Sequence, residues 1–446
     1  MKKLAFIAVA LFAAGTACGA HITMCDTLRG SKVYPGTVHT IQVTVPGQYD
    51  ASAPANLYLG LDGILCNAPE VIDNLIGEGV LDPTVGVFLQ PGVIYDADGE
   101  IVSYNRSNEF DATDSRFAEF LETEVLPRVE SMTTPDGRKL RLSREPARRM
   151  IFGLSSGGIA AFTAAWHRPD LFGKVYTGCG TFVSMRGGND LPALVRKTEP
   201  KPLRLFLQDG FQDAWNPLFG SWFEANALLA SALEFAGYDM RTDWTNSGHS
   251  VTRTSEIFPQ VMRWLFRDGA APLAVPSSKN DMLADILVEG SGWTPCGMRC
   301  IPAGKKTKAD AHVQALYPDG RHKATVRQNT NYLWKEILDK NGKTVVEQPF
   351  YWLHTYNNGI VSVPSMQFDS KGNLWVLTDN GIQVCDQNGR VRAMLPLPRG
   401  FEATCDARIE IGDGFVILSS PSLTVTRLFN VAPGITGQSP KSQGPA

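Results

Sequence analysis

The stretch RRMIFGLSSGGIAAF (residues 148–162) places two adjacent serines between glycines. An apolar run, residues 148–153, stands directly before the serines, and the run after them is small and apolar all round. This order predicts a buried strand, a tight turn and a helix packed against a sheet. Because Gly-x-Ser-x-Gly occurs often by chance in a glycine-rich chain, its meaning depends on the rest of the sequence.

The glycine spacing distinguishes the two serines. In a strained strand-to-helix turn, the residues two before and two after a nucleophile must be small, because strand and helix approach closely there. Ser155 has Gly153 and Gly157 at these positions. Ser156 has Leu154 at the first of them, which would clash. We therefore expect Ser155 to be the nucleophile and the backbone N–H of Ser156 to be an oxyanion donor.

The surrounding chain predicts an α/β fold. Short apolar runs that end in turns alternate with helical patterns over residues 40–270, which is typical of a mostly parallel sheet flanked by helices. The expected strands are residues 55–63, 85–92, 148–153, 174–180 and 203–210. Helices are expected over residues 114–132, with Asp114 as the cap, and over residues 221–238.

The pattern changes after a linker rich in Pro, Ala and Ser. Beyond it, Asp/Asn-Gly turns separate alternating apolar runs, which predicts hairpins in a smaller all-β region with partial propeller-like or sandwich sheets. The turns are YPDGR, DKNGK, DSKGN and DQNGR. The predicted organisation is a signal peptide (1–20), an α/β domain (21–268), a linker (269–282), a β-rich domain (283–433) and a disordered tail (434–446).

The N-terminus predicts export. Lys2 and Lys3 precede the apolar run LAFIAVALFAA and the small residues GTACGA, which is typical of a secretory signal cleaved after Ala20. The run is too short to span a bilayer, and no later segment is long and apolar enough. Lipidation of Cys18 is the less favoured alternative, because Gly15 stands where a large aliphatic residue is usual. We expect a periplasmic or extracellular protein.

Charge and cysteine usage exclude several classes. The net charge of −3 gives no electrostatic footprint for nucleic acid or an anionic membrane. Seven cysteines remain after Ala20, an odd number scattered over a long chain, so this is no disulfide scaffold. Cys296 and Cys300 are the expected local pair; a zinc site there would need two more clustered ligands, and no metal or organic cofactor is expected.

A nucleophilic serine needs a base and an acid that orients the base. In this type of fold the order along the chain is Ser, acid, His. His249 stands in a polar turn after a strand-like run, as a base would, whereas the other histidines precede the serine or lie at a helix end or in the second region. Asp209 and Asp213 both follow an expected strand. Asp213 is favoured because it stands further out in the loop.

A second oxyanion donor should come from the loop after an early strand. The run GLDGILC (residues 60–66) fits this description. The expected donor is the backbone N–H of Gly63 or of Ile64, although a plain turn would have the same sequence.

Several motifs together resemble the esterase D/enterochelin esterase-like family of α/β-hydrolases over about residues 30–268. They are the run YPGTVHTIQVTVPGQYDASAPANLYLGLDG, followed by NRSNEFD, FLETEVLPRV, GLSSGG, WHRPDLFGKVYTGCGTF, DGFQDAW and SGHS. The resemblance implies that Ser155 is the nucleophile, Asp213 the acid and His249 the base. Arg106 and Glu109 match polar positions of the family, and we expect them to form a structural ion pair near the site.

The second region has a shorter resemblance. The run SMQFDSKGNLWVLTDNGIQVCDQNGRVRAMLPLP is similar to blades of the gluconolactonase-like propellers. A complete six-bladed ring needs more chain than is present here. Ser365 and Met366 also stand where these lactonases have Asp-Gly, the aspartate being a metal ligand. A partial propeller used in packing, binding or assembly is therefore expected.

Together these observations predict an exported serine ester hydrolase that acts through an acyl-enzyme. The expected substrates are small-molecule or polysaccharide-linked esters, with acetyl or feruloyl groups on carbohydrate favoured. The alternatives are a siderophore trilactone esterase, a non-catalytic carbohydrate-binding or assembly protein, and a metal-dependent sugar lactonase using the second region. The sequence does not specify the oligomeric state.

Overall fold

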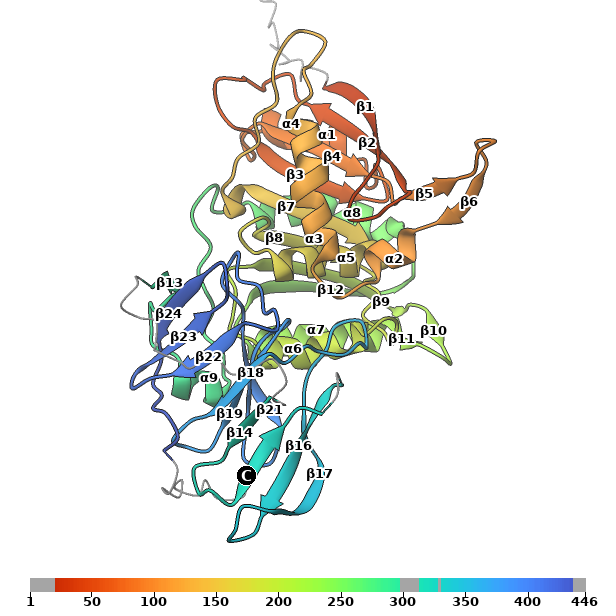
Figure 1. Cartoon of the computed structure of the whole chain (residues 1–446). Coiled ribbons are helices and arrows are strands. Elements are labelled where there is room, and N and C mark those ends of the chain that lie inside the picture. Colours follow the sequence, from red (N-terminus) through yellow and green to blue (C-terminus); the bar gives the residue numbers. More distant parts are fainter. Residues whose placement is uncertain (1–20, 297–312, 328–329, 436–446) are drawn as a thin grey trace, which may run out of the picture.

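The computed structural model describes residues 21–296, 313–327 and 330–435. It contains one large sheet covered by helices, a two-stranded sheet of β10 (Trp215–Asn216) and β11 (Gly220–Ser221), and three four-stranded sheets that follow (Figure 1). We call residues 21–268 the α/β region and residues 281–435 the C-terminal region. Every helix in the described residues is too short or too polar to cross a membrane.

Strands that are buried at nearly every position form the centre of the large sheet. Strands buried on both faces are typical of parallel sheets with helices on each side, and these strands pair in parallel. They are β3 (Asn56–Leu61), β4 (Thr84–Leu89), β7 (Arg149–Leu154), β8 (Lys174–Gly178) and β9 (Arg204–Gln212). The edge strand β12 (Asp239–Gly248) also pairs in parallel, with β9, but is only partly buried. Each of the five strands predicted in this region is present.

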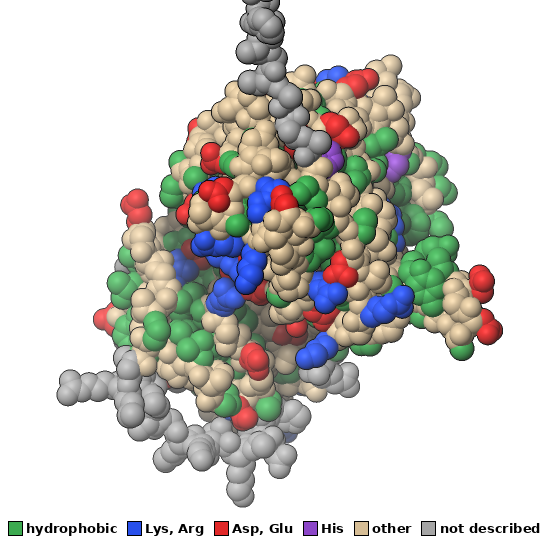
Figure 2. All heavy atoms as spheres, turned by 90° about the horizontal axis from the view of Figure 1, so that it is seen from above, with side chains coloured by type: hydrophobic (Ala, Val, Ile, Leu, Met, Phe, Trp, Pro, Cys, Tyr) green, Lys and Arg blue, Asp and Glu red, His purple; other side chains and the backbone are tan. Residues whose placement is uncertain are grey.

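Four further strands extend the sheet in antiparallel pairing. The order of the ten-stranded sheet is β12-β9-β8-β7-β3-β4-β2-β5-β6, with β1 paired to β2. The added strands are β1 (Ile22–Arg29), β2 (Val38–Val45), β5 (Val93–Tyr95) and β6 (Ile101–Tyr104). The β5–β6 hairpin projects from the body and carries a group of hydrophobic side chains (Figures 1 and 2).

Helices cover both faces of the large sheet. One face packs on α1 (Ala68–Gly77) and α8 (Val251–Leu265). The other face packs on the remaining helices of the region. These are α2 (Arg106–Phe110), α3 (Arg116–Phe120), α4 (Leu126–Glu130), α5 (Ser156–His167), α6 (Leu191–Lys197) and α7 (Trp222–Phe235).

The helix predicted over residues 114–132 has a local irregularity. A π-helical turn, Leu121–Val125, separates α3 from α4. Pro127 follows at the start of α4 and has no N–H to donate, so the regular hydrogen-bond ladder is interrupted here. The N-cap residue is Ser115 and not the predicted Asp114, which precedes it; Asp114 Oδ1 accepts the N–H of Arg116 at 3.1 Å.

The C-terminal region consists of three four-stranded antiparallel sheets and the short helix α9 (Asp281–Ile286). Their orders are β13-β24-β23-β22, β14-β15-β16-β17 and β18-β19-β20-β21. The strands are β13 (Thr294–Pro295), β14 (Gln314–Leu316), β15 (His322–Thr325), β16 (Tyr332–Leu338), β17 (Thr344–Trp352), β18 (Ser365–Phe368), β19 (Leu374–Thr378), β20 (Gly381–Cys385), β21 (Val391–Leu395), β22 (Arg408–Ile411), β23 (Phe415–Ser419) and β24 (Thr424–Leu428).

The four predicted turns each join two antiparallel strands. In each turn an aspartate Oδ1 accepts backbone N–H groups two or four residues further on; for Asp339 these are Asn341 and Lys343, both at 2.9 Å. The glycine of each turn has positive φ, a conformation that costs glycine little. The propeller resemblance of these sheets stays a prediction.

Several contacts join the C-terminal region to the α/β region, and two of them are made by Asn357 and Arg427. Asn357 Oδ1 accepts the backbone N–H of Thr113 at 2.6 Å, and Asn357 Nδ2 donates to Asp114 Oδ2 at 2.6 Å. Arg427 donates to both carboxylate oxygens of Glu199, at 2.8 and 2.6 Å. These bonds fix the C-terminal sheets against the helix-covered face of the α/β region.

Some predictions fall outside the described residues. The expected signal peptide, including Cys18, lies in residues 1–20, and most of the expected tail lies in residues 436–446. Cys296 is disulfide-bonded. Its predicted partner, Cys300, lies in the segment 297–312, outside the described residues.

Candidate active site

The turn between β7 and α5 has the strained backbone that the nucleophile prediction requires. Ser155 has φ 58° and ψ −121°, and Ser156 is the first residue of the helix. A Cβ atom at Gly153 would lie 2.0 Å from the carbonyl oxygen of Gly157, so neither strand nor helix leaves room for a side chain. This packing holds Ser155 in a conformation that L-residues rarely adopt.

Two residues that the sequence did not point to surround the Ser155 hydroxyl. Ser155 Oγ lies 3.3 Å from Thr181 Oγ1, and Thr181 Oγ1 accepts the indole N–H of Trp222 at 3.2 Å. The Trp222 ring in turn meets the His249 ring edge to face, with centroids 6.2 Å apart. Thr181 therefore lies between Ser155 and Trp222, while the described structure records no hydrogen bond between Ser155 and His249. Neither Thr181 nor Trp222 stands in a motif with a chemical signature.

His249 and Asp213 form a hydrogen-bonded pair. His249 Nδ1 lies 2.6 Å from Asp213 Oδ1, which also accepts the backbone N–H of Ala214 at 2.5 Å. The Asp213 side chain is fully buried, while the His249 side chain is 32% exposed. Burial raises the pKa of Asp213, but the hydrogen bonds from His249 and Ala214, with the adjacent Asp209, outweigh it and hold the pKa below its usual value. Asp213 is therefore an anion that can orient an imidazole.

The alternative acid, Asp209, lies deeper. It is inside β9 and fully buried, and its Oδ1 accepts the backbone N–H of Gly210 at 2.7 Å. Burial, together with the hydrogen bond and the charge of the neighbouring Asp213, raises its pKa to about 9. Of the two aspartates, Asp213 is the one that contacts His249.

The predicted oxyanion donors have different environments. Ser156 begins α5, so its backbone N–H lies at the N-terminal end of a 12-residue helix, where backbone N–H groups and the helix dipole favour negative charge. The N–H of Gly63 donates to the carbonyl of Leu89 at 3.2 Å. Because the Gly63 N–H is used in this bond, the backbone N–H of Ile64 is the remaining predicted oxyanion donor in that loop.

The predicted ion pair between Arg106 and Glu109 is wrong, because each side chain bonds a different partner. Arg106 donates from Nε and Nη2 to the two oxygens of Asp62, at 2.7 and 2.8 Å. Glu109 is fully buried and accepts from Gly92 N at 3.0 Å and lies 3.0 Å from His39 Nε2. The two side chains of a short helix therefore face different parts of the fold. Asp62 could not be identified as a partner from the sequence because it is 44 residues away.

The Arg106–Asp62 pair lies beside the serine turn. Arg106 Nη2 is 3.5 Å from the carbonyl oxygen of Leu154, and a Cβ atom on Gly157 would lie 3.0 Å from Asp62 Oδ2. The Arg106 side chain is 35% exposed, and its hydrogen bonds to Asp62 raise its pKa further. A fixed guanidinium therefore borders the site.

One cluster in the described residues has a spacing that suits a metal ion. Ligand atoms of Cys179, Asp213 and His249 all lie within 4.8 Å of one another. However, burial and the nearby carboxylates raise the pKa of the Cys179 thiol well above its ordinary value, so the sulfur is not a thiolate at neutral pH. Asp213 and His249 already bond to each other. These donors suit a hydrogen-bonded acid and base better than a metal site.

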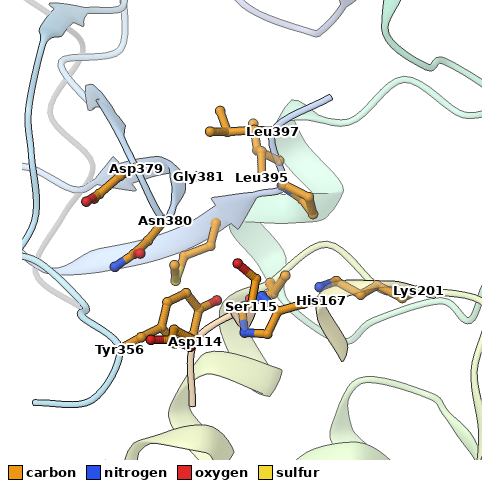
Figure 3. A pocket seen from close by; sticks show the side chains of 13 residues that line it. Asp114, Ser115, His167, Lys201, Tyr356, Asp379, Asn380, Gly381, Leu395 and Leu397 are labelled. Carbon is orange, nitrogen blue, oxygen red and sulfur yellow. The ribbon is translucent and has the colours of Figure 1, made fainter. Parts of the chain in front are cut away.

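A pocket of about 200 Å³ lies at the junction of the two regions (Figure 3). Its residues include His167 and Lys201 from the α/β region, and Tyr356 and Asp379 from the C-terminal region. Burial lowers the pKa of His167 to about 4 and that of Lys201 to about 7. The lining does not include Ser155, Asp213 or His249, so this pocket is a product of the junction.

One family model matches the chain. It is described as "Putative esterase" and matches residues 33–256, half of the chain. The match contains Ser155, Asp213 and His249 and ends before the C-terminal region. No curated protein matches the chain.

Several solved structures are similar to the chain. A ferulic acid esterase is 18% identical with a TM-score of 0.43, covering 55% of this chain and 98% of its own. The enterobactin esterase from Shigella flexneri with 2,3-Di-hydroxy-N-benzoyl-glycine is 20% identical with a TM-score of 0.43, covering 55% and 60%. A feruloyl esterase module from Clostridium thermocellum with sinapinate is 13% identical with a TM-score of 0.39, covering 56% and 89%. The chain thus spans three fifths of the enterobactin esterase.

Proposed function

We propose, from the premise that this chain belongs to the esterase family and is a carboxylic ester hydrolase, that Ser155, His249 and Asp213 form its catalytic triad. The observation that carries the proposal is the 2.6 Å bond between His249 Nδ1 and Asp213 Oδ1. This bond holds the ring in the tautomer whose Nε2 is free to accept a proton. The strained Ser155 turn supports the same assignment.

In the proposed reaction, Ser155 Oγ attacks the ester carbonyl while His249 Nε2 takes its proton. The imidazolium is stabilised by the Asp213 carboxylate and then protonates the leaving alkoxide, which departs as the alcohol. Water, deprotonated by His249, attacks the acyl-enzyme and releases the carboxylic acid. His249 returns the proton to Ser155 Oγ, so the enzyme is regenerated.

The tetrahedral intermediates carry a negative oxygen. We assign the backbone N–H groups of Ser156 and Ile64 to it, since the Gly63 N–H is already used. Donors fixed before the reaction stabilise the developing charge without reorganisation, and removing one such donor typically costs about 10²–10³-fold in kcat.

We propose carbohydrate-linked acetyl or feruloyl esters as substrates. Large hydrophobic side chains remain exposed on segments that follow the carboxyl ends of β4 and β9, where the site is built. Tyr104 is 76% exposed on the β5–β6 hairpin, and Trp215 and Phe211 are 71% and 55% exposed on either side of Asp213. Aromatic faces of this kind pack well on sugar and aryl rings. A siderophore trilactone is the alternative substrate.

Export is proposed from the N-terminal sequence alone. Lys2 and Lys3 before an apolar run, followed by small residues up to Ala20, are typical of a cleaved signal. Cell fractionation with the wild-type N-terminus tests this proposal, since intact precursor in the cytoplasm would contradict it.

The lactonase alternative receives no support from the positions where it would need a metal ligand. Ser365 Oγ accepts the N–H of Ile409 at 3.2 Å, and Met366 is buried in the core. Both side chains are used in packing the C-terminal sheets.

The experiment compares hydrolysis of aryl acetates, methyl ferulate and acetylated xylan by the wild type, Ser155→Ala and Ser156→Ala, each with and without a chelator. We expect Ser155→Ala to lose at least about 10⁴-fold in kcat, with Ser156→Ala, whose backbone donor is unchanged, close to the wild type. Activity retained by Ser155→Ala, or lost on chelation, would refute the proposed mechanism.

A further inference from the structure

A second buried carboxyl group lies directly behind the proposed triad acid. Asp209 and Asp213 stand four residues apart at the end of β9, and their side chains contact each other. Asp209 is fully buried, as is the Asp213 side chain. The proposed triad uses only one of the two.

The hydrogen bonds of the pair are incomplete without a proton between them. Asp209 Oδ1 accepts from Gly210 N, and Asp213 Oδ1 accepts from Ala214 N and pairs with His249 Nδ1. Within the described structure the other two oxygens, Asp209 Oδ2 and Asp213 Oδ2, are buried and have no donor. A buried acceptor without a donor is costly, so a hydrogen between these atoms would satisfy both.

The surroundings of Asp209 favour its neutral form. The groups that face it are the Cys179 thiol directly after β8, Asp213 in the loop after β9 and, beyond Asp213, the His249 ring after β12. None of these places a cation directly against Asp209. Two adjacent buried carboxylates repel each other, so one of them keeps its proton.

We propose that Asp209 is a positioning residue: its carboxyl group stays protonated at neutral pH and donates its O–H to Asp213 Oδ2, which fixes the carboxylate that orients His249. The inference rests on the triad of the proposed function. The proton stays on Asp209 throughout the reaction, because the proton that moves passes only between Ser155, His249 and the leaving group. The pair therefore carries one negative charge in every step.

The arrangement gives the site an alkaline limit. Burial, together with the hydrogen bond and charge of Asp213, raises the pKa of Asp209 to about 9. Above that pH, loss of the proton would remove the donor and place a second negative charge against Asp213. We expect kcat to fall on the alkaline side with an apparent pKa near this value.

The test measures the pH profiles of kcat and KM for an aryl acetate with the wild type, Asp209→Asn and Asp209→Ala. An asparagine amide can donate to Asp213 Oδ2 but does not ionise. We expect Asp209→Asn to keep kcat within about threefold at pH 7 and to lose the alkaline limb. Asp209→Ala should lose about 10–100-fold in kcat with KM nearly unchanged, in line with the loss of an outer partner that orients a functional group.

A matched control removes a neighbouring acid that the site does not use. Asp243 on β12 pairs with Arg253 through bonds of 2.8 Å, and Asp243→Asn should leave both the rate and the alkaline limb unchanged. Thermal unfolding of each variant shows whether a loss of rate is a loss of folded protein. An Asp209→Ala rate equal to the wild type would overturn the proposal.

An infrared measurement tests the proton without using activity. At neutral pH the wild type should show a carboxylic acid C=O band that disappears in Asp209→Asn, and its absence from the wild type would overturn the proposal. The rate of Ser155→Ala distinguishes a failure of the proposed triad from a failure of the proposed role of Asp209. An active Ser155→Ala protein refutes the triad, whereas an inactive one combined with equal damage in Asp209→Asn and Asp209→Ala refutes only the role of Asp209.

Discussion

Non-glycine residues with positive φ are distributed unequally between the two regions. Among the described residues, the C-terminal region has two, the adjacent Asn357 and Asn358, and asparagine tolerates this conformation well. The α/β region has six, and three of them, Asp62, Ser155 and Cys179, surround the candidate active site. In the C-terminal region, positive φ occurs at residue types that adopt it readily, so its turns can be predicted from the sequence. The α/β region holds unfavourable backbone at the site through surrounding packing.

The largest expected difference between the two regions comes from replacing one histidine in each by alanine. His249→Ala removes the proposed base and should lower kcat by about 10⁴-fold, because the serine then has no proton acceptor. His354 belongs to the C-terminal region, and its Nε2 lies 2.8 Å from Nζ of Lys197 in the α/β region. His354→Ala should change kcat less than about threefold. Steady-state kinetics on an aryl acetate measures both. Comparable losses in the two variants would place part of the chemistry in the C-terminal region.

The second concerns packing around strained backbone. Gly153→Ala would place its Cβ 2.0 Å from the Gly157 carbonyl oxygen, and we expect a loss of about 3 kcal/mol or more in the free energy of unfolding. Gly342→Ala lies in a turn with φ 78° and open space around it, so only the backbone cost of about 1 kcal/mol applies. Urea denaturation checks the difference. Equal losses would mean that the serine turn is no more tightly packed than a surface hairpin.

The third concerns the junction. Asn357→Ala removes the side chain that bonds Thr113 and Asp114, and we expect it to destabilise the protein by about 2 kcal/mol while kcat stays within twofold. Asn358→Ala is the control, because it carries the same positive φ and therefore the same backbone cost. Thermal unfolding and kinetics are measured together. A large loss of kcat in Asn357→Ala would show that the C-terminal region supports catalysis directly.

The smallest expected effect is a pH dependence at the same junction. Burial, and then the charge of Lys201, lowers the pKa of His167 to about 4. Its unfolded value is about 6.5, so the unfolded chain binds more protons between these values and stability falls as pH drops through this window. Between pH 7 and pH 5 the wild type should lose free energy of unfolding, and His167→Gln should reduce this loss by about 1 kcal/mol, a value that allows for the partial exposure of the His167 ring. Denaturation curves with parallel pH slopes for both proteins would contradict this.

The features that could be predicted from the sequence are those that depend on residues adjacent in the chain. The serine turn, the strands of the sheet centre and the four Asp-Gly hairpin turns each follow from a few adjacent residues. The β5–β6 hairpin was missed because its second strand is exposed at all four positions and has no apolar periodicity.

Contacts between distant residues explain the remaining differences. The Arg106 guanidinium bonds Asp62 and not Glu109, because the buried Glu109 carboxylate is already bonded to His39 and to the N–H of Gly92. The position where β9 ends distinguishes the two candidate acids. The strand continues to Gln212, so Asp209 lies inside the sheet and Asp213 lies in the loop beside His249. A one-dimensional pattern does not show where a strand stops relative to its neighbours.

The bond between Arg427 and Glu199 has a consequence for how the protein is made. Its two residues are 228 positions apart in the chain, and the Asn357–Thr113 bond spans 244. During synthesis, at about 5–20 residues per second, the α/β region leaves the ribosome well before these partners exist. We therefore expect the α/β region to fold around its own sheet first, with the surface near Glu199 uncovered until the C-terminal region packs against it.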